Sequence, residues 1–363
     1  MPDNLRCYRS IQLGLKKFYP AEPTGNLVRH LRTLAALISG IVGSKHTHLP
    51  QIAAKMVDGN KPESRTKAYS RWIANDKIDY ETYYLPYVET LLQSLTHRPL
   101  VLIMDVSAVG RGCVTLMLSV VYQGRALPLI WSTLAGSKGH LAEEVHLDLL
   151  QRAQALVPAN ARVIFLGDGE FDGANLIKAI ASSSWQYVCR TANNRRLQEG
   201  EESFSFRQID VGAEEFFHVP NVCFDSAPEL RFHAVMWWER CYKEPIYLIS
   251  NIDPPHEVLF WYKKRYHIET FFSDQKSRGF HLHKSHVSDP ERLSRLMIAA
   301  CLAYIWIVYL GIWAIHHNWH HQIHRSDRCD LSLFQLGLRM LEHCLNLRKK
   351  APFALQLNLF DCS

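Results

Sequence analysis

Apolar residues recur with a helical period over the first quarter of the chain. They are three to four positions apart from Leu27 to Val42 and again from Tyr80 to Leu95, which predicts two amphipathic helices. Segments 48–56 and 64–73 lie between them, are also helical in pattern, and are separated by a turn over residues 57–63 that contains Gly, Asn and Pro. We therefore expect a helical N-terminal region.

From residue 98 onward the pattern changes to short apolar runs that are typical of strands. Residues 100–105, 114–122 and 127–133 predict a three-stranded meander, which a helix over 140–157 and an apolar run over 162–168 follow. A meander that passes into an α/β crossover predicts a mixed sheet with helices on its faces.

Two of these runs end in an aspartate, Asp105 and Asp168. We expect both at strand ends, because rigid scaffolds present catalytic groups there. For Asp168 the alternative is a turn-forming role before Gly169.

Residues 191–245 carry short alternating apolar runs separated by Gly, Asp, Pro and Asn, which predict a β-rich insertion. Arg195 and Arg196, at its start, are candidates for phosphate contact. Trp237 and Trp238, near its end, would stack on a base if they are exposed. The alternative, which we favour, is that the tryptophans pack inside the protein.

Residues 260–276 predict one amphipathic helix. At about 100° per residue, four of its side chains share a narrow stripe: Tyr262, Arg265, Glu269 and Lys276. Four others are expected on the opposite, solvent-facing side: Lys263, His267, Thr270 and Asp274.

The stripe suits phosphate chemistry, because a carboxylate can ligate a hard cation while neighbouring bases hold phosphodiester oxygens. The alternative is an ion-paired surface helix, since Arg265 and Glu269 are four residues apart.

The segment Leu296 to Ile315 has no charged residue and is long enough to cross a bilayer. It continues directly from the charged segment 289–295, and a helix that is apolar on all sides can also form the centre of a large core. We expect the buried helix and no membrane partner. A terminal amphipathic helix is predicted over 331–347.

The pattern thus divides the chain into five regions. They are a helical N-terminal region over residues 1–97, two parts of an α/β core over 98–190 and 246–320, the β-rich insertion over 191–245, and a C-terminal helical region over 321–363.

Composition excludes a largely disordered chain, since 47% of the residues are hydrophobic and 21% are charged. The net charge of +6 is a mild basic excess that permits a polyanionic partner. The nine cysteines contain no CxxC pair, and the polar N-terminal residues lack a secretory leader pattern, so we expect reduced thiols in a cytoplasmic protein.

Three carboxylates, Asp105, Asp168 and Glu269, suit two-metal phosphoryl transfer. In such sites acids hold two Mg²⁺ ions, for which Mn²⁺ can substitute, about 3.5 to 4 Å apart. The helices over 48–56 and 64–73 resemble a helix-turn-helix DNA reader with three exposed bases, although an ordinary helical hairpin fits equally well: Arg65, Lys67 and Arg71. Lys284, in a basic loop, is a further candidate DNA contact.

The spacing Tyr, two residues, Arg, three residues, Glu, six residues, Lys is reproduced in full by the stripe on residues 260–276. With the two aspartates and the β-rich insertion, the chain resembles bacterial insertion-sequence DDE transposases. The likeness is greatest to the insertion-sequence-four family, which has the YREK signature and an RNase H-like catalytic domain. The resemblance extends over most of the chain.

The resemblance implies that Asp105, Asp168 and Glu269 form the metal-binding triad. It also implies that the other stripe residues, Tyr262, Arg265 and Lys276, grip phosphates at the element end. By the same resemblance, the protein would bind the double-stranded DNA of transposon ends and target as a homodimer at the nucleoid. The reaction would be cut-and-paste, in some relatives through a DNA hairpin. Two alternatives stay open: a metal-dependent DNA nuclease without strand transfer, and a catalytically silent DNA-binding relative.

Overall fold

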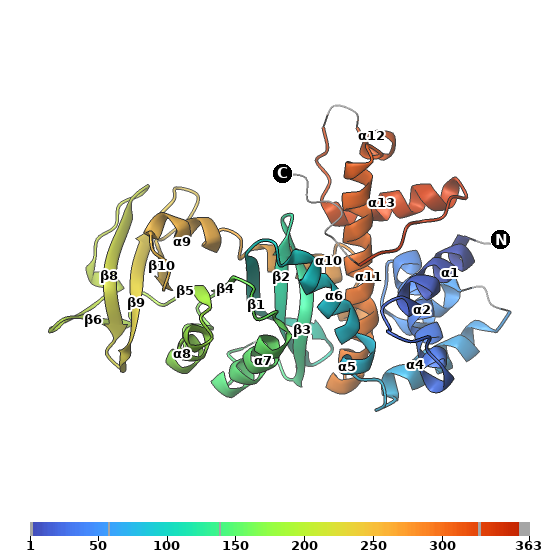
Figure 1. Ribbon diagram of the computed structural model, residues 1–363, viewed down its shortest axis with the longest axis horizontal. Coiled ribbons are helices and arrows are strands. Elements are labelled where there is room, and N and C mark those ends of the chain that lie inside the picture. Colours follow the sequence, from blue (N-terminus) through green and yellow to red (C-terminus); the bar gives the residue numbers. More distant parts are fainter. Residues whose placement is uncertain (1–2, 57–58, 138, 326–327, 356–363) are drawn as a thin grey trace.

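The computed structural model describes residues 3–56, 59–137, 139–325 and 328–355. Residues 57–58 of the predicted turn lie outside these ranges. The helices of residues 3–74 and the sheet lie on opposite sides of one long helix, α11 (Pro290–His316), in an elongated molecule (Figure 1).

The N-terminal region is helical, as predicted. Its elements are α1 (Asp3–Lys16), α2 (Gly25–Ser44), α3 (Leu49–Lys55), α4 (Pro62–Ala74), α5 (Tyr80–Tyr83) and α6 (Leu85–Leu95). The helix predicted over 80–95 is interrupted at Tyr84, because Pro86 in the first turn of α6 has no N–H to continue the hydrogen bonding.

One ten-stranded sheet forms the rest of the framework, in the order β3-β2-β1-β4-β5-β10-β9-β8-β6-β7. The strands are β1 (Leu100–Gly110), β2 (Cys113–Tyr122), β3 (Arg125–Ala135), β4 (Val163–Gly167), β5 (Gln186–Arg190), β6 (Arg196–Glu199), β7 (Glu202–Ser205), β8 (Phe216–Phe224), β9 (Ala227–Trp237) and β10 (Ile246–Ser250). β1, β2 and β3 are antiparallel, whereas β1, β4 and β5 are parallel. With α7 (Glu143–Leu156) and α8 (Ala174–Ser182), this confirms the predicted mixed sheet flanked by helices.

The strands predicted within 191–245 are present, and they extend this same sheet. β9 pairs with β10, and β10 pairs with β5 of the core. The insertion and the α/β core are therefore hydrogen-bonded into one sheet.

Asp105 does not end its strand, and this part of the prediction is wrong. β1 runs five residues further, to Gly110, because its second half pairs with β2, as at Ser107 and Thr115. β4 is shorter, and its last residues pair with β1 through Leu166 and Ile103. Asp105 and Asp168 both follow this pair by two residues, so they emerge at the same level of the sheet.

The uncharged segment 296–315 lies within α11 (Pro290–His316), which is buried over most of its length. In the described residues α11 is the one helix long and apolar enough to cross a membrane, and 89% of its most apolar window is buried inside the protein. The predicted core helix is confirmed. Gly337 of α13 (Leu333–Asn346) allows a close approach, since a Cβ there would lie 1.8 Å from the carbonyl oxygen of Ile307.

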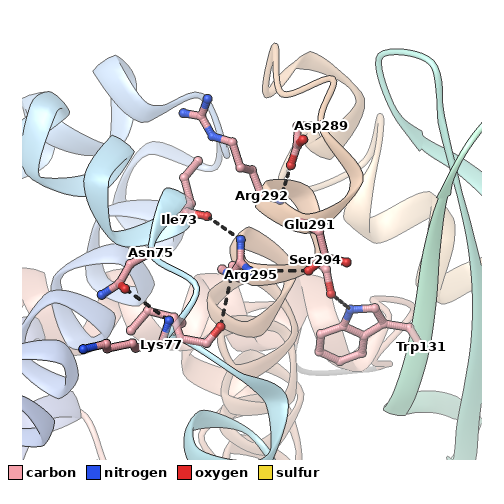
Figure 2. Close-up of polar contacts among 10 residues, drawn as sticks. Ile73, Asn75, Lys77, Trp131, Asp289, Glu291, Arg292, Ser294 and Arg295 are labelled. Carbon is pink, nitrogen blue, oxygen red and sulfur yellow. Dashed lines mark hydrogen bonds and ion pairs between the residues drawn. The ribbon is translucent and has the colours of Figure 1, made fainter.

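The first turns of α11 join three parts of the fold (Figure 2). Asp289 caps the helix by accepting a hydrogen bond from Arg292 N at 2.8 Å. Ser294 accepts one from the Trp131 indole of β3 at 3.0 Å, and Arg295 donates to the carbonyl of Ile73 at 3.4 Å. These bonds hold the sheet and the N-terminal helices against the same helix.

The segment predicted as one helix over 260–276 forms two, α9 (Pro255–Tyr262) and α10 (His267–Gln275). Several backbone hydrogen bonds between them span three residues instead of four, such as that from Arg265 N to Tyr262 O at 2.9 Å. α9 packs on β4, β5 and β9, whereas α10 packs on β1 and β3. Because the sheet twists, one straight helix would not lie on both parts.

Candidate active site

An open depression of about 500 Å³ lies where β1, the loop after β4 and α10 meet. Its lining comprises Asp105, Val106, Ser107, Asp168, Arg265, Glu269, Phe272, Ser273, Lys276 and Ser277. All three predicted catalytic acids and two of the predicted phosphate-binding bases are therefore brought together, from segments far apart in the sequence.

Asp105 is partly buried on β1. Burial, followed by the negative charge of Asp168, raises the pKa of its carboxyl to about 6, while Arg265 and the Val106 N–H oppose the shift and Glu269 adds to it. The Val106 N–H donates to Oδ1 at 2.8 Å. The carboxylates of Asp105, Asp168 and Glu269 together create a negative potential in the depression, which a bound cation would neutralise.

Asp168 holds the turn after β4. Its Oδ1 accepts a hydrogen bond from Glu170 N at 3.0 Å, and its carbonyl accepts one from Phe171 N at 3.0 Å. Glu170 is fixed in turn by Leu141 N at 2.9 Å and by the buried His146 ring at 3.4 Å. The predicted turn-forming role of Asp168 is thus present, and it uses Oδ1 and the backbone carbonyl.

Glu269 forms an ion pair with Arg265 across one helical turn, with Arg265 Nη2 2.6 Å from Glu269 Oε1. The glutamate side chain is 57% exposed and that of the arginine 18%. The ion-paired alternative from the sequence is therefore realised, but the pair also lines the depression with both aspartates.

The oxygen donors fit a divalent cation, since hard cations such as Mg²⁺ prefer carboxylates. Within the described ranges, however, no three His, Cys, Asp or Glu side chains are gathered closely enough to hold an ion. Asp105 and Asp168 would hold it from the sheet, and Glu269 would complete the set only after its carboxylate turns away from Arg265.

Lys276 points into the depression from the end of α10. Its Nζ donates to Ser107 Oγ at 2.5 Å and lies 5.6 Å from the centre of the Phe272 ring. Ser107 was missed at the sequence level, although a signal existed. It lies two residues after Asp105 and so on the same face of the strand.

A second depression of about 410 Å³ adjoins the first. It is lined by Arg190, Tyr242, Lys243, Glu244, Ile246, Tyr262, Lys263, Arg265, Tyr266 and Glu269. Arg265 and Glu269 line both. The break between α9 and α10 thus divides the predicted stripe: Tyr262 faces the second depression and Lys276 the first.

One side chain of the predicted solvent face, Asp274, differs from expectation. Asp274 is buried, with its Oδ2 3.1 Å from Arg125 Nη1 of β3. Helical periodicity predicts the solvent face for Asp274 because it cannot show a partner from a distant strand.

Among the predicted DNA contacts of the N-terminal helices, Arg65 is wrong as an exposed base. Its guanidinium donates to the carbonyls of Ala53 at 2.6 Å, Asn60 at 2.8 Å and Met56, and so ties α4 to the end of α3. Lys67 and Arg71 are exposed, as predicted.

Of the remaining basic residues predicted to contact DNA in and after the insertion, one packs against the protein and two are exposed. Arg195 lies over the Phe224 ring at 4.4 Å and pairs with Asp172 at 3.6 Å, whereas Arg196 is exposed and pairs with Asp225 at 2.9 Å. Lys284 is exposed.

The two tryptophans pack against the protein, which is the alternative favoured at the sequence level. Trp237 is buried, with Lys263 Nζ 4.7 Å above its ring, and the Trp238 indole donates to the Tyr242 carbonyl at 3.0 Å. The Trp237 ring is therefore not an exposed stacking surface, and the Trp238 ring is partly buried.

The raised pKa of Asp105 makes the stability of the metal-free protein depend on pH. The folded pKa of about 6 exceeds the ordinary value of 3.8, so the folded state binds this proton more tightly and stability falls as pH rises through that interval. Asp105→Asn should therefore stabilise the protein by about 1 to 3 kcal/mol at about pH 7. Urea unfolding in EDTA would measure the gain.

The same measurement at about pH 4 is the control, because the wild-type carboxyl is then largely protonated in the folded state and the gain should shrink. A variant that is less stable than wild type at about pH 7 would contradict this account of the site.

A protein family and a solved structure match this chain. A cryo-EM structure of the piggyBac transposase synaptic complex with hairpin DNA has 13% sequence identity and a TM-score of 0.44, over 98% of this chain and 83% of that chain. A search of curated proteins finds no match. Residues 107–306 match the family described as the transposase DDE domain, starting two residues after Asp105 and including Asp168 and Glu269. Because the match spans more than half of the 363 residues, the chain belongs to the transposase DDE domain family.

Proposed function

We propose that the protein is a DNA transposase that cleaves phosphodiesters at the ends of its element and joins the freed 3′-hydroxyls to target DNA. The observation that supports this most directly is the depression that collects Asp105, Asp168 and Glu269 beside Lys276. Membership of the transposase DDE domain family gives the reaction class.

Asp105, Asp168 and Glu269 would hold Mg²⁺, or Mn²⁺ in its place. When bound, the metal supplies an activated attacking oxygen and stabilises the leaving oxygen. Asp105 on β1 and Asp168 directly after β4 would approach the metal from the sheet, and Glu269 would have to leave its ion pair with Arg265 to join them.

Lys276 and Arg265 would bind phosphate oxygens. Lys276 is held at the depression by Ser107, and Arg265 can exchange its carboxylate partner for a phosphodiester, which its planar guanidinium also matches. A phosphate that replaces Glu269 at Arg265 would free that carboxylate for the metal. Tyr262, in the adjoining depression, would contact the strand next to the scissile phosphate.

The Tyr-Arg-Glu-Lys spacing supports a place in the insertion-sequence-four family. Family resemblance also supports a homodimeric synapse, a hairpin step and a location at the nucleoid, which are parts of the proposal.

A strand-transfer assay tests the proposal. Purified protein, Mg²⁺ and pre-cut duplexes that carry the DNA flanking the gene are mixed with supercoiled plasmid. We expect plasmid molecules covalently joined to the duplex, detected on a gel. Uncut flanking DNA serves in parallel to measure cleavage.

The two rival functions give different results. Cleavage without joined products would identify a nuclease, and binding without cleavage would identify a silent relative. Either result would overturn the proposal that the protein is a transposase.

A further inference from the structure

Five histidines from two distant segments meet beside the active site. His46 and His48 lie between α2 and α3, and the others lie in the loop around the short helix η2 (Leu282–Lys284). His46 stacks on His281 with ring centres 5.2 Å apart, and His48 meets His286 edge-on at 4.8 Å. His283 lies 5.9 Å from His281.

The backbone holds this arrangement in place. The Thr47 hydroxyl donates to the carbonyl of His281 at 3.3 Å, and His48 N donates to His46 Nδ1 at 3.0 Å. His281 N donates to the carbonyl of Lys276 at 2.9 Å. The histidine surface, defined as these five histidines with Lys45 and Lys284, therefore begins at the last residue of the predicted phosphate-binding set.

Its other side reaches the predicted DNA reader. His48 directly precedes α3, the first of the two helices with the helix-turn-helix-like pattern. The histidine surface thus connects two regions that were each predicted, on separate grounds, to contact DNA.

The surroundings disfavour positive charge in the free protein. Burial, followed by His281 and His48, lowers the pKa of His46 to about 4, with Lys284 and His283 adding to the shift. Burial and then His286 lower the pKa of His48.

The pKa of His283, on the exposed part of the loop, is lowered in the same way. Burial, followed by His281, Lys284 and Lys276, lowers the pKa of His283. Within the described residues, no carboxylate forms an ion pair with any of the five histidines. A protonated His283 consequently has Lys276 and Lys284 as cationic neighbours and no carboxylate of the described residues within ion-pair distance.

We propose that the histidine surface binds the DNA backbone and takes up protons when it does so. Phosphates would supply the negative charge that the protein itself does not place there, and imidazolium rings donate from both nitrogens. This inference rests on the proposed function and deepens it, by assigning the DNA path between the active site and the N-terminal helices.

The linkage has a definite sign. If the bound complex holds more protons than the free protein, affinity must rise as pH falls. One extra proton gives at most about a tenfold change in affinity per pH unit, so about tenfold or more is expected between about pH 8 and about pH 6.

The test is fluorescence anisotropy with a labelled duplex of the DNA flanking the gene, in EDTA and at constant ionic strength. All proteins carry Asp105→Asn, because the pKa of Asp105 lies near the same range and its protonation would also favour DNA. The background protein should bind about tenfold more tightly at the lower pH. Adding His283→Gln and His286→Gln should remove most of this difference.

Two further variants make the result specific. His321→Gln, at an exposed histidine outside the surface, should keep the full pH dependence. His283→Lys with His286→Lys should bind at about pH 8 as tightly as the background protein binds at about pH 6, since lysine stays charged.

The outcomes separate the two proposals. Equal affinity at both pH values, or an unchanged pH dependence in the double glutamine variant, would overturn the histidine surface while leaving DNA binding intact. An absence of DNA binding at either pH would overturn the proposed function, and the inference with it.

Discussion

Replacing any one of Asp105, Asp168 and Glu269 by its amide is expected to lower metal-dependent cleavage by about a thousandfold or more. An amide keeps the size of the side chain but removes the negative charge that a divalent cation needs, and metal assistance contributes several kcal/mol to such reactions. The rate of nicking of the flanking DNA, in saturating Mg²⁺, measures the effect.

Matched amide substitutions elsewhere distinguish lost chemistry from lost folding. Asp225→Asn removes a charge from an exposed ion pair with Arg196, and Glu257→Gln does the same on α9, so both should cleave at nearly the wild-type rate. Full activity in one of the three acid variants would remove that residue from the site. Glu269 forms an ion pair with Arg265 in this structure. Glu269→Gln therefore also tests whether cleavage requires the Glu269 carboxylate to leave that pair.

Asp274→Ala is expected to destabilise the fold by about 3 to 5 kcal/mol, because it leaves the buried Arg125 without its carboxylate. The two side chains are only 5% and 13% exposed. Burial raises the pKa of Asp274 to about 6 even though Arg125 and Arg278 oppose the shift, so desolvation of this pair is costly. Urea unfolding at about pH 8, where the carboxyl is ionised, measures the loss.

Asp148→Ala is the matched control, since Asp148 pairs with Arg152 at 3.7 Å on the surface of α7. Its loss should be about 0 to 1 kcal/mol. Replacing both members of the buried pair by apolar residues, Asp274→Leu with Arg125→Met, should recover much of the stability. Equal losses for Asp274→Ala and Asp148→Ala would show that the buried pair does not hold α10 to β3.

Local patterns predicted most elements of this fold. Helical periods located α2, α4 and α13, and apolar runs located β1 to β4, because both signals depend on residues close in sequence. The spacing of the stripe and the aspartates likewise identified the charged residues that line the first depression, although it missed Ser107 and included Tyr262, which lines the second.

The errors share a physical cause, which is contact with residues outside the segment that showed the pattern. β1 passes beyond Asp105 because β2 is long enough to pair with it, and Asp274 is buried because Arg125 reaches it from β3. Arg65 appeared exposed on a helical pattern, yet the carbonyls it binds belong to the preceding helix and turn. Hydrophobic pattern along one segment contains none of this information.

The position of α11 in the chain affects the order in which the molecule can be built. This helix buries apolar faces of both the N-terminal helices and the sheet, yet it is synthesised after nearly all of them. Until its last turn has left the ribosome, both partners keep uncovered surfaces that favour aggregation. Completion of the core therefore has to wait until residue 316 has been synthesised, long after the surfaces that α11 covers have formed.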